Sequence, residues 1–168
     1  MNRENTACFS GHRPERFPNY RQIEFEALLR LLNKRVNEAI DEGYKHFIVG
    51  MQKGWDTLAG EAVLSIREEA KPHITLELAI PFEGHAEKLN LTADDRKRYD
   101  RLVKEANKIS ILSRHFYKAA YHNRDIYMID NSSYLIYFWD GGPGGTSRAV
   151  QYAQEQELKM KNLYMRGW

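Results

Sequence analysis

Residues 134–146 read Tyr-Leu-Ile-Tyr-Phe-Trp-Asp-Gly-Gly-Pro-Gly-Gly-Thr. The first six are apolar or aromatic throughout, which predicts a strand buried on both faces at the centre of a sheet. Four glycines within 141–145 then lead into a helical pattern that runs to about Met160. A buried strand, a glycine-rich turn and a helix in this order predict an α/β fold with a ligand at the turn.

The rest of the chain repeats this alternation of short apolar runs and longer helical patterns. The other strands that we expect cover residues 6–9, 47–49, 75–80 and 109–112, with a last edge strand at 163–165. The other helices cover 22–42, 56 to about 70, 93–107 and 121–130. Gly43 and Pro72 end two of them, and Thr92 begins another as a hydroxyl cap. The order predicts a Rossmann-like three-layer α/β fold with a mostly parallel central sheet, in a single domain over 1–168.

Alternation within 75–80 has a further consequence. Leu76, Leu78 and Ile80 alternate with Thr75, Glu77 and Ala79, so one face of this strand is expected to be wet. The strand is therefore expected near the edge of the sheet.

Composition excludes several classes of protein. In 168 residues, 42% are hydrophobic and 29% charged, which is incompatible with wholesale disorder. A net charge of +2 argues against a dedicated duplex-binding protein. The start of the chain lacks an apolar signal core, and the run 134–139 is too short to span a bilayer. We expect a cytoplasmic protein without a membrane partner, and one cysteine, Cys8, fits a reducing compartment.

Parallel strands place the loops that follow them at one edge of the sheet, where such folds bind ligands. The first of these loops contains Ser10, Gly11, His12 and Arg13. Glycine lets the backbone approach a ligand closely, and Arg13 can form a forked contact with a phosphate. A plain strand-end turn with a solvated arginine explains the same residues, and the loop alone does not decide.

The second loop places Gly50 and Gly54 before a helix, a spacing that suits anion binding by free amides. Asp56 either caps that helix or binds a ribose hydroxyl. Glu61, one turn after Thr57, is expected to face the same cleft. The Ser or Thr that follows the lysine of a P-loop is absent after Lys53, which argues against a magnesium-dependent NTPase.

The glycine-rich loop after 134–139 is the sharpest local signal. The amides of Gly144, Gly145 and Thr146 are expected to point at a phosphate, with the Thr146 hydroxyl as a further donor. Asp140 and Gly141 belong to the same loop. It is not the ordinary dinucleotide fingerprint, which follows the first strand rather than the fifth.

Other side chains are weaker candidates. Six histidines show no metal-ligand spacing, so we expect no metal site. Arg124 lies beside the cleft or simply caps its helix. Tyr20, Trp55 and Phe82 are aromatic groups able to stack a base, although core packing is the simpler explanation of each.

The three loops together resemble the YpsA-like family of the SLOG superfamily. The motifs are Thr-Ala-Cys-Phe-Ser-Gly-His-Arg-Pro at 6–14, Gly-x3-Gly-x-Asp-x2-Ala-x-Glu at 50–61 and Asp-Gly-Gly-Pro-Gly-Gly-Thr at 140–146. The resemblance implies a Rossmann-like fold with a site for a nucleotide or nucleotide-derived ligand. Met51 stands where the family often has a glycine, which is expected to narrow the phosphate approach. His85 and Leu89 replace a common Gln and Trp, which is expected to change the base or sugar pocket.

Related phosphoribohydrolases of the superfamily carry a Glu in the turn after Gly-Thr, where this chain has Ala149. The second loop also resembles that of the DNA-processing protein DprA, which binds single strands. We therefore expect a protein that binds an ADP-ribose-like or dinucleotide-derived ligand, as a sensor or sequestering module. One alternative is an N-glycosidic hydrolase that uses Asp56 or Glu61. The other is a single-stranded DNA binder.

No cofactor is expected apart from the nucleotide-derived ligand itself. The expected partners are a small nucleotide, a second copy of the chain and, less favoured, nucleic acid. The ligand-binding residues are expected to be Ser10, Gly11, His12, Arg13, Gly50, Gly54, Asp56, Arg124, Asp140, Gly141, Gly144, Gly145 and Thr146.

Overall fold

A computed structural model describes residues 2–17 and 22–165, without the side chains of 22–24. Within this part of the chain, six strands form one sheet in the order β4-β3-β2-β1-β5-β6, and every neighbouring pair is parallel. The strands are β1 (Thr6–Gly11), β2 (His46–Val49), β3 (Thr75–Ile80), β4 (Lys108–Ile111), β5 (Tyr134–Phe138) and β6 (Lys159–Asn162). The Rossmann-like prediction is confirmed.

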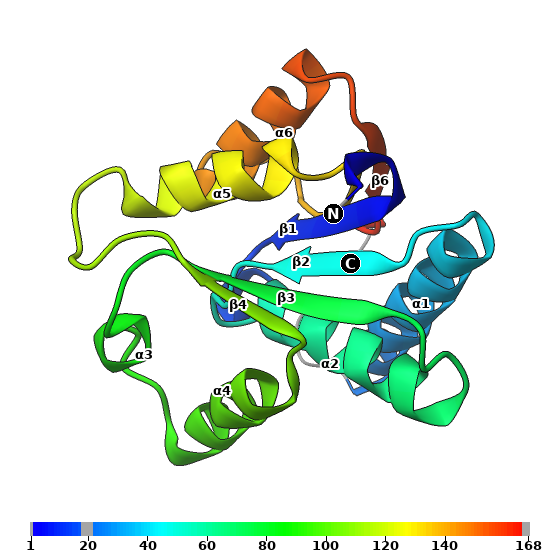
Figure 1. Ribbon diagram of the computed structural model, residues 1–168, viewed down its shortest axis with the longest axis horizontal. Helices are drawn as coiled ribbons and strands as arrows, with labels where there is room; N and C mark the ends of the chain where they lie inside the picture. The colour runs from blue at the N-terminus through cyan, green and yellow to red at the C-terminus, as the bar shows by residue number, and fades with distance from the viewer. Residues whose placement is uncertain (1, 18–21, 166–168) are drawn as a thin grey trace.

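Helices cover both faces of the sheet (Figure 1). On one face lie α5 (Ala120–Asp130) and α6 (Gly145–Glu155), which pack against each other. On the other lie α1 (Gln22–Asp41), α2 (Trp55–Glu69) and α4 (Ala93–Glu105), with the short α3 (His85–Lys88) near α4. Two 3-10 turns, η1 (Arg3–Asn5) and η2 (Pro14–Arg16), flank β1.

The strand order creates a switch point next to β1. From β1 the chain moves outward through β2, β3 and β4, and then crosses to β5 and β6 on the other side. The connections that leave β1 and β5 therefore run to opposite faces of the sheet and leave a crevice at the carboxyl ends of these strands. This is where such folds bind ligands.

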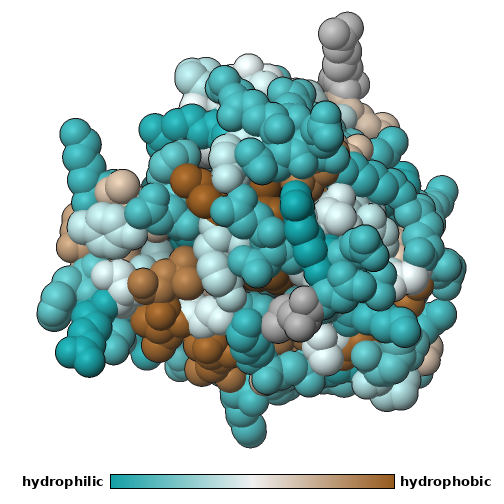
Figure 2. All heavy atoms as spheres, turned by 45° about the horizontal axis from the view of Figure 1, so that its top comes forward, coloured by the Kyte–Doolittle hydropathy of each residue, from teal (hydrophilic) through white to brown (hydrophobic). Residues whose placement is uncertain are grey.

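The core fills the space between the sheet and each layer of helices. One apolar cluster includes Phe9, Phe47 and Trp55 on the α1–α2 side, and the other includes Cys8, Ile48 and Ala149 on the α5–α6 side. The face of the molecule seen in Figure 2 is mostly hydrophilic, with hydrophobic side chains in separate groups. No helix among the described residues is both long and apolar enough to cross a bilayer.

Two helix boundaries follow the local signals in the sequence. Gly43 has φ +104°, and its amide and that of Tyr44 bond back to Ile40 and Ala39, which ends α1 as expected. The Thr92 hydroxyl accepts a hydrogen bond from the Asp95 amide at 3.1 Å and begins α4.

The last helix and strand differ from the prediction. α6 ends at Glu155 rather than near Met160, and the edge strand is 159–162 rather than 163–165. Glu157 adopts φ +57°, and the amides of Glu157 and Leu158 bond back to Gln154 and Ala153. A residue with positive φ at the end of a helix is usually a glycine. Because a glutamate adopts this conformation here, the sequence carries no signal for the end of α6.

β3 does not have the wet face that its alternation suggested. Glu77 is fully buried, and its carboxylate accepts hydrogen bonds from His46, Ser110 and Tyr127 at 2.8, 2.7 and 2.6 Å. β3 is the second strand from one edge, covered by α5 on the face that Glu77 occupies. Glu77, which the alternation places on the face expected to be wet, is therefore buried with hydrogen-bond partners instead of solvated.

Candidate functional site

A cleft of about 420 Å³ lies beside the switch point, at the carboxyl end of β1. Its walls are the loop after β1, the starts of α2 and α6, and one side of α5. The predicted site residues that line it are Ser10, Gly11, His12, Arg13, Asp56, Arg124, Gly145 and Thr146. The remaining ones, Gly50, Gly54, Asp140, Gly141 and Gly144, lie outside its lining, in the loops that support it. Residues far apart in the sequence thus meet in one place.

The glycine-rich loop presents the start of α6 to this cleft. Gly144 has φ +139°, a conformation that only glycine adopts readily. No described residue accepts a hydrogen bond from the amides of Gly144, Gly145 or Thr146. The Thr146 side chain is buried against the cleft wall. Unpaired amides at the positive end of a helix are the features that bind an anion.

Two arginines add free positive charge to the same cleft. Arg13 and Arg148 both line it and are exposed. No hydrogen bond or ion pair from another described residue reaches either guanidinium. Arg148 was not predicted, because a single arginine inside a helical pattern is indistinguishable from a solvated one.

Asp140 braces the glycine loop instead of facing the cleft. Its carboxylate accepts hydrogen bonds from Arg16 at 2.7 Å and from the Gly142 amide at 2.8 Å, and it lies 2.9 Å from His12 Nε2. Burial opposes its charge, but the Gly142 amide and Arg16 hold the pKa of Asp140 below its ordinary value. Arg16 also donates to the Pro143 carbonyl. Arg16, missed in the sequence, therefore ties the loop after β1 to the glycine loop.

His12 takes part in the same network. Burial lowers the pKa of His12, although the nearby Asp140 carboxylate acts in the opposite direction. The lowered pKa favours the neutral ring. Its Nε2 lies 3.0 Å from the Asp140 amide, which donates to it. His12 lines the cleft at its edge, so its main contacts position the two loops.

Asp56 is the acid buried in the cleft, with 4% of its surface exposed. Burial raises the pKa of Asp56 to about 6, although Arg124 and the Gln52 amide act in the opposite direction. Its Oδ2 accepts a hydrogen bond from the Gln52 amide at 3.1 Å. The capping alternative is wrong, because α2 begins at Trp55 with Gly54 as its cap residue and no side-chain cap.

Arg124 is buried beside Asp56. It donates to Asp125 Oδ1 from Nε and Nη2, at 3.1 and 2.9 Å, and to the Gly50 carbonyl from Nη1 at 2.8 Å. A Cβ on Gly50 would lie 2.8 Å from Nε, so only glycine leaves room for this guanidinium. Arg124 is therefore committed to holding Asp125 and the second loop.

The glycines of the first two loops serve close packing. A Cβ on Gly11 would lie 2.4 Å from Trp55 Cγ. One on Gly54, which has φ +89°, would lie 2.8 Å from the His12 carbonyl oxygen. The start of α2 is consequently pressed against the loop after β1, and the Trp55 amide donates to the His12 carbonyl. Glycine here brings loops together, a role that the sequence pattern does not separate from ligand binding.

Glu61 does not share the cleft with Asp56. It forms a forked ion pair with Arg98 of α4, at 2.7 and 2.8 Å, on the opposite side of α2. The expectation that it faces the cleft is thus not met. Helical spacing places Glu61 one turn from Thr57, and Thr57 itself faces α4 rather than the cleft.

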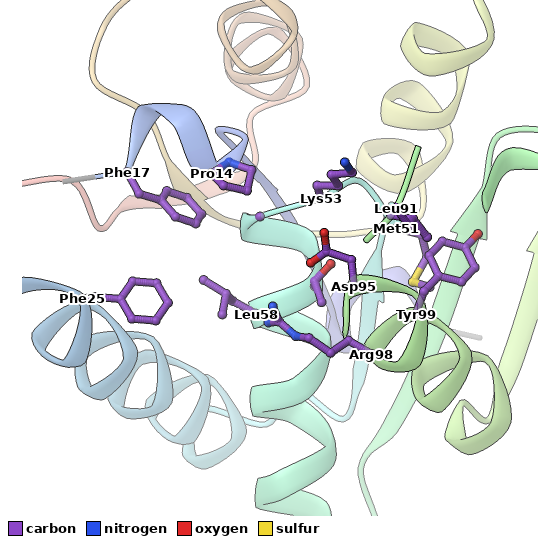
Figure 3. Close-up of a pocket in the computed structure, with 12 residues that line it drawn as sticks. Pro14, Phe17, Phe25, Met51, Lys53, Leu58, Leu91, Asp95, Arg98 and Tyr99 are labelled. Carbon is purple, nitrogen blue, oxygen red and sulfur yellow. The ribbon is translucent and has the colours of Figure 1, made fainter. Parts of the chain in front are cut away.

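A second, smaller pocket of about 290 Å³ lies on the side of α2 that faces α4. Figure 3 shows the residues that line it. Phe17, Leu58 and Tyr99 are among its apolar walls, and Met51 lies against Tyr99. Met51 is buried in the apolar core and adopts φ +63°. The expectation that it narrows the phosphate approach is wrong, since its side chain does not line the cleft.

Ala149 is also buried in an apolar cluster, with Cys8 and Leu135. Its neighbour Arg148 is the residue of that turn that lines the cleft. The carboxylates that do line the cleft are those of Glu15, Asp56 and Asp125.

Among the aromatic candidates, Trp55 and Phe82 are core residues with at most 2% exposed surface. Tyr20 lies outside the described residues. The cleft lining includes the half-buried ring of Tyr121 in α5 and the fully buried ring of Phe9 in β1, and His85 packs against Tyr121. Burial lowers the pKa of His85 to about 3, with Arg124 adding to the effect, so this ring is neutral.

An all-parallel sheet with helices on both faces and a cleft at its switch point defines a Rossmann-like α/β protein. The chain belongs to the YpsA-like SLOG family, because the family model described as "YspA SLOG family" matches residues 7–166. A UPF0398 protein of Shouchella clausii is 25% identical over 115 residues, 67% of this chain and 60% of that relative.

Two solved structures share the fold. DNA processing protein A (DprA) from Streptococcus pneumoniae superposes with a TM-score of 0.60 at 13% identity, over 95% of this chain and 50% of that one. DprA from Helicobacter pylori, described for its single-stranded DNA binding mode, gives 0.60 at 18% identity, over 96% and 66%. The chain thus spans about half to two thirds of these proteins and relatives.

Proposed function

We propose that the protein binds a nucleotide-derived ligand with its phosphates in the cleft beside β1. The observation that carries this proposal is the meeting of unpaired amides at the start of α6 with two unpaired arginines in one cleft. An anion at these amides gains both hydrogen bonds and the field of the helix. Arg13 and Arg148 supply charge for a second phosphate, which favours a diphosphate such as that of ADP-ribose.

The rest of the cleft suits a nucleoside. Tyr121 offers a half-buried ring for a base, and Asp56 offers a carboxylate oxygen for a sugar hydroxyl. The lining thus combines the positive start of α6 with carboxylates from α2 and α5. A ligand that carries both phosphates and hydroxyl donors matches this combination.

The proposed activity is binding of the ligand without its hydrolysis. The superfamily's phosphoribohydrolases carry a carboxylate one turn into the helix after Gly-Thr, and this chain has Ala149 buried there. Arg148, the residue of that turn that lines the cleft, contributes a positive side chain instead. The oxocarbenium-like transition state of that hydrolysis therefore lacks the carboxylate that those enzymes place at this turn. The ligand is therefore held for sensing or sequestration.

Single-stranded DNA is the second candidate, favoured by the fold shared with DprA of Helicobacter pylori. The low net charge of the chain, +2, weakens it, because proteins that bind a polyanion usually present a strongly basic surface. In the test below, single-stranded DNA is accordingly one of the ligands.

Isothermal titration calorimetry with ADP-ribose, ADP and a dT oligonucleotide tests the proposal. Gly145→Val is the informative variant, because a Cβ at Gly145 meets no atom within 4 Å and the fold can accept it. The added methyl groups would occupy the place of the anion, so affinity should fall at least tenfold. Gln154→Val places the same side chain on the exposed end of α6 and should bind normally. Equal affinity of Gly145→Val and the parent, or tight binding of the oligonucleotide alone, would overturn the proposal.

A further inference from the structure

Two acids in the cleft lining, the buried Asp56 and the half-buried Asp125, have unused hydrogen-bonding capacity. Asp56 Oδ2 accepts from the Gln52 amide, and no described residue donates to Oδ1. Asp125 Oδ1 takes both bonds from Arg124, and no described residue donates to Oδ2. Both acids line the cleft. Each therefore presents one free oxygen to whatever occupies it.

Arg124 fixes the position of Asp125 and lies beside Asp56. Its hydrogen bonds go to Asp125 and to the Gly50 carbonyl, and the absence of a Cβ at Gly50 leaves the space that its guanidinium fills. Its positive charge also favours the charged form of Asp56, against the effect of burial on the pKa of Asp56. Arg124 is a positioning residue, because its donors are used inside the protein and not on a phosphate.

We propose that Asp56, held by the Gln52 amide, and Asp125, held by Arg124, select a ribose over a 2′-deoxyribose. This inference rests on the proposed function, which places phosphate at the start of α6. An ionised carboxylate accepts hydrogen bonds and donates none, so the two free oxygens need two donors from the ligand. The vicinal 2′- and 3′-hydroxyls of a ribose are the pair of adjacent donors that a nucleotide carries.

A deoxyribose satisfies only one of these oxygens. The other is left without a donor from the ligand, which is costly for a charged acceptor that the bound ligand shields from water. Phosphates cannot take its place, because they repel the carboxylates. The same acids therefore disfavour DNA, which separates this cleft from a single-stranded DNA site.

Calorimetric titration of the full chain with ADP and with 2′-deoxy-ADP tests the inference. ADP should bind at least tenfold more tightly. Asp125→Asn should remove most of this difference, since an amide oxygen is a weaker acceptor and the amide nitrogen donates. Glu15→Gln, a change of charge at an exposed acid of the same cleft, should preserve the difference.

The outcomes are distinguishable. Equal affinity for ADP and 2′-deoxy-ADP, or an undiminished difference in Asp125→Asn, would refute ribose selection and leave the proposed function standing. Failure of both nucleotides and of ADP-ribose to bind would remove the proposed function and the inference with it. A thermal melt of Asp125→Asn separates loss of folding from loss of selectivity, and Asp56→Asn provides a second variant on the other acid.

Discussion

Asp56→Asn should make the free protein more stable at neutral pH. The carboxylate of Asp56 is buried with a single hydrogen bond from the described residues, so its charge is poorly compensated. Asparagine has nearly the same shape and keeps an oxygen for the Gln52 amide. The substitution removes the charge and leaves Arg124 its contacts with Asp125.

The magnitude follows from the pKa of Asp56, which is about 6 in the folded chain against an ordinary value of 3.8. Each pKa unit corresponds to about 1.36 kcal/mol, so the ionised group costs about 3 kcal/mol of folding free energy above pH 6. Between pH 3.8 and 6 the folded state binds the proton more tightly than the unfolded state. The cost is therefore absent below pH 3.8 and complete once the pH has risen through 6.

Urea unfolding of the parent and of Asp56→Asn, followed from pH 4 to pH 8, measures this difference. The variant should gain about 3 kcal/mol at pH 8, and the gain should shrink toward zero at pH 4. Glu83→Gln, at an exposed acid, should follow the parent at every pH. A variant less stable than the parent at pH 8, or a difference independent of pH, would refute this account of the buried charge.

Further predictions concern the fold and the site. Glu77→Gln should lower the free energy of unfolding by about 3 kcal/mol at pH 7, because hydrogen bonds from its partners outweigh burial and hold the pKa of Glu77 at about 2. In urea titrations, this loss should fade as the pH falls from 4.5 toward 2. Arg13→Ala should weaken ADP-ribose binding by about 2–3 kcal/mol in calorimetry, with Arg13→Lys recovering only part. Met51→Gly should relieve about 1 kcal/mol of backbone strain but remove a buried side chain. The free energy of unfolding in urea should therefore fall by about 2 kcal/mol. Nucleoside monophosphates incubated with the protein should release no free base on chromatography; release that vanishes in Asp56→Asn would favour the hydrolase.

Local signals in the sequence were enough for the order of elements and for the loops that carry the site. Gly43 and Thr92 mark helix ends through contacts with residues three to five positions away, so they are readable from a short stretch. The apolar run 134–138 and the glycines after it predict the strand and the turn in the same way. The family resemblance added the expectation of a nucleotide-derived ligand, which the spacing of residues alone does not specify.

Only tertiary structure decided which side chains meet. Glu61 and Asp56 lie on one helix, yet one pairs with Arg98 of α4 and the other is buried beside Arg124 of α5. Arg16 and Asp140 are bonded between the loops that follow the adjacent strands β1 and β5, although 124 positions separate them. Such pairs depend on which strands become neighbours and on what space remains between helices. These are properties of the whole packed chain, and no short stretch of sequence contains them.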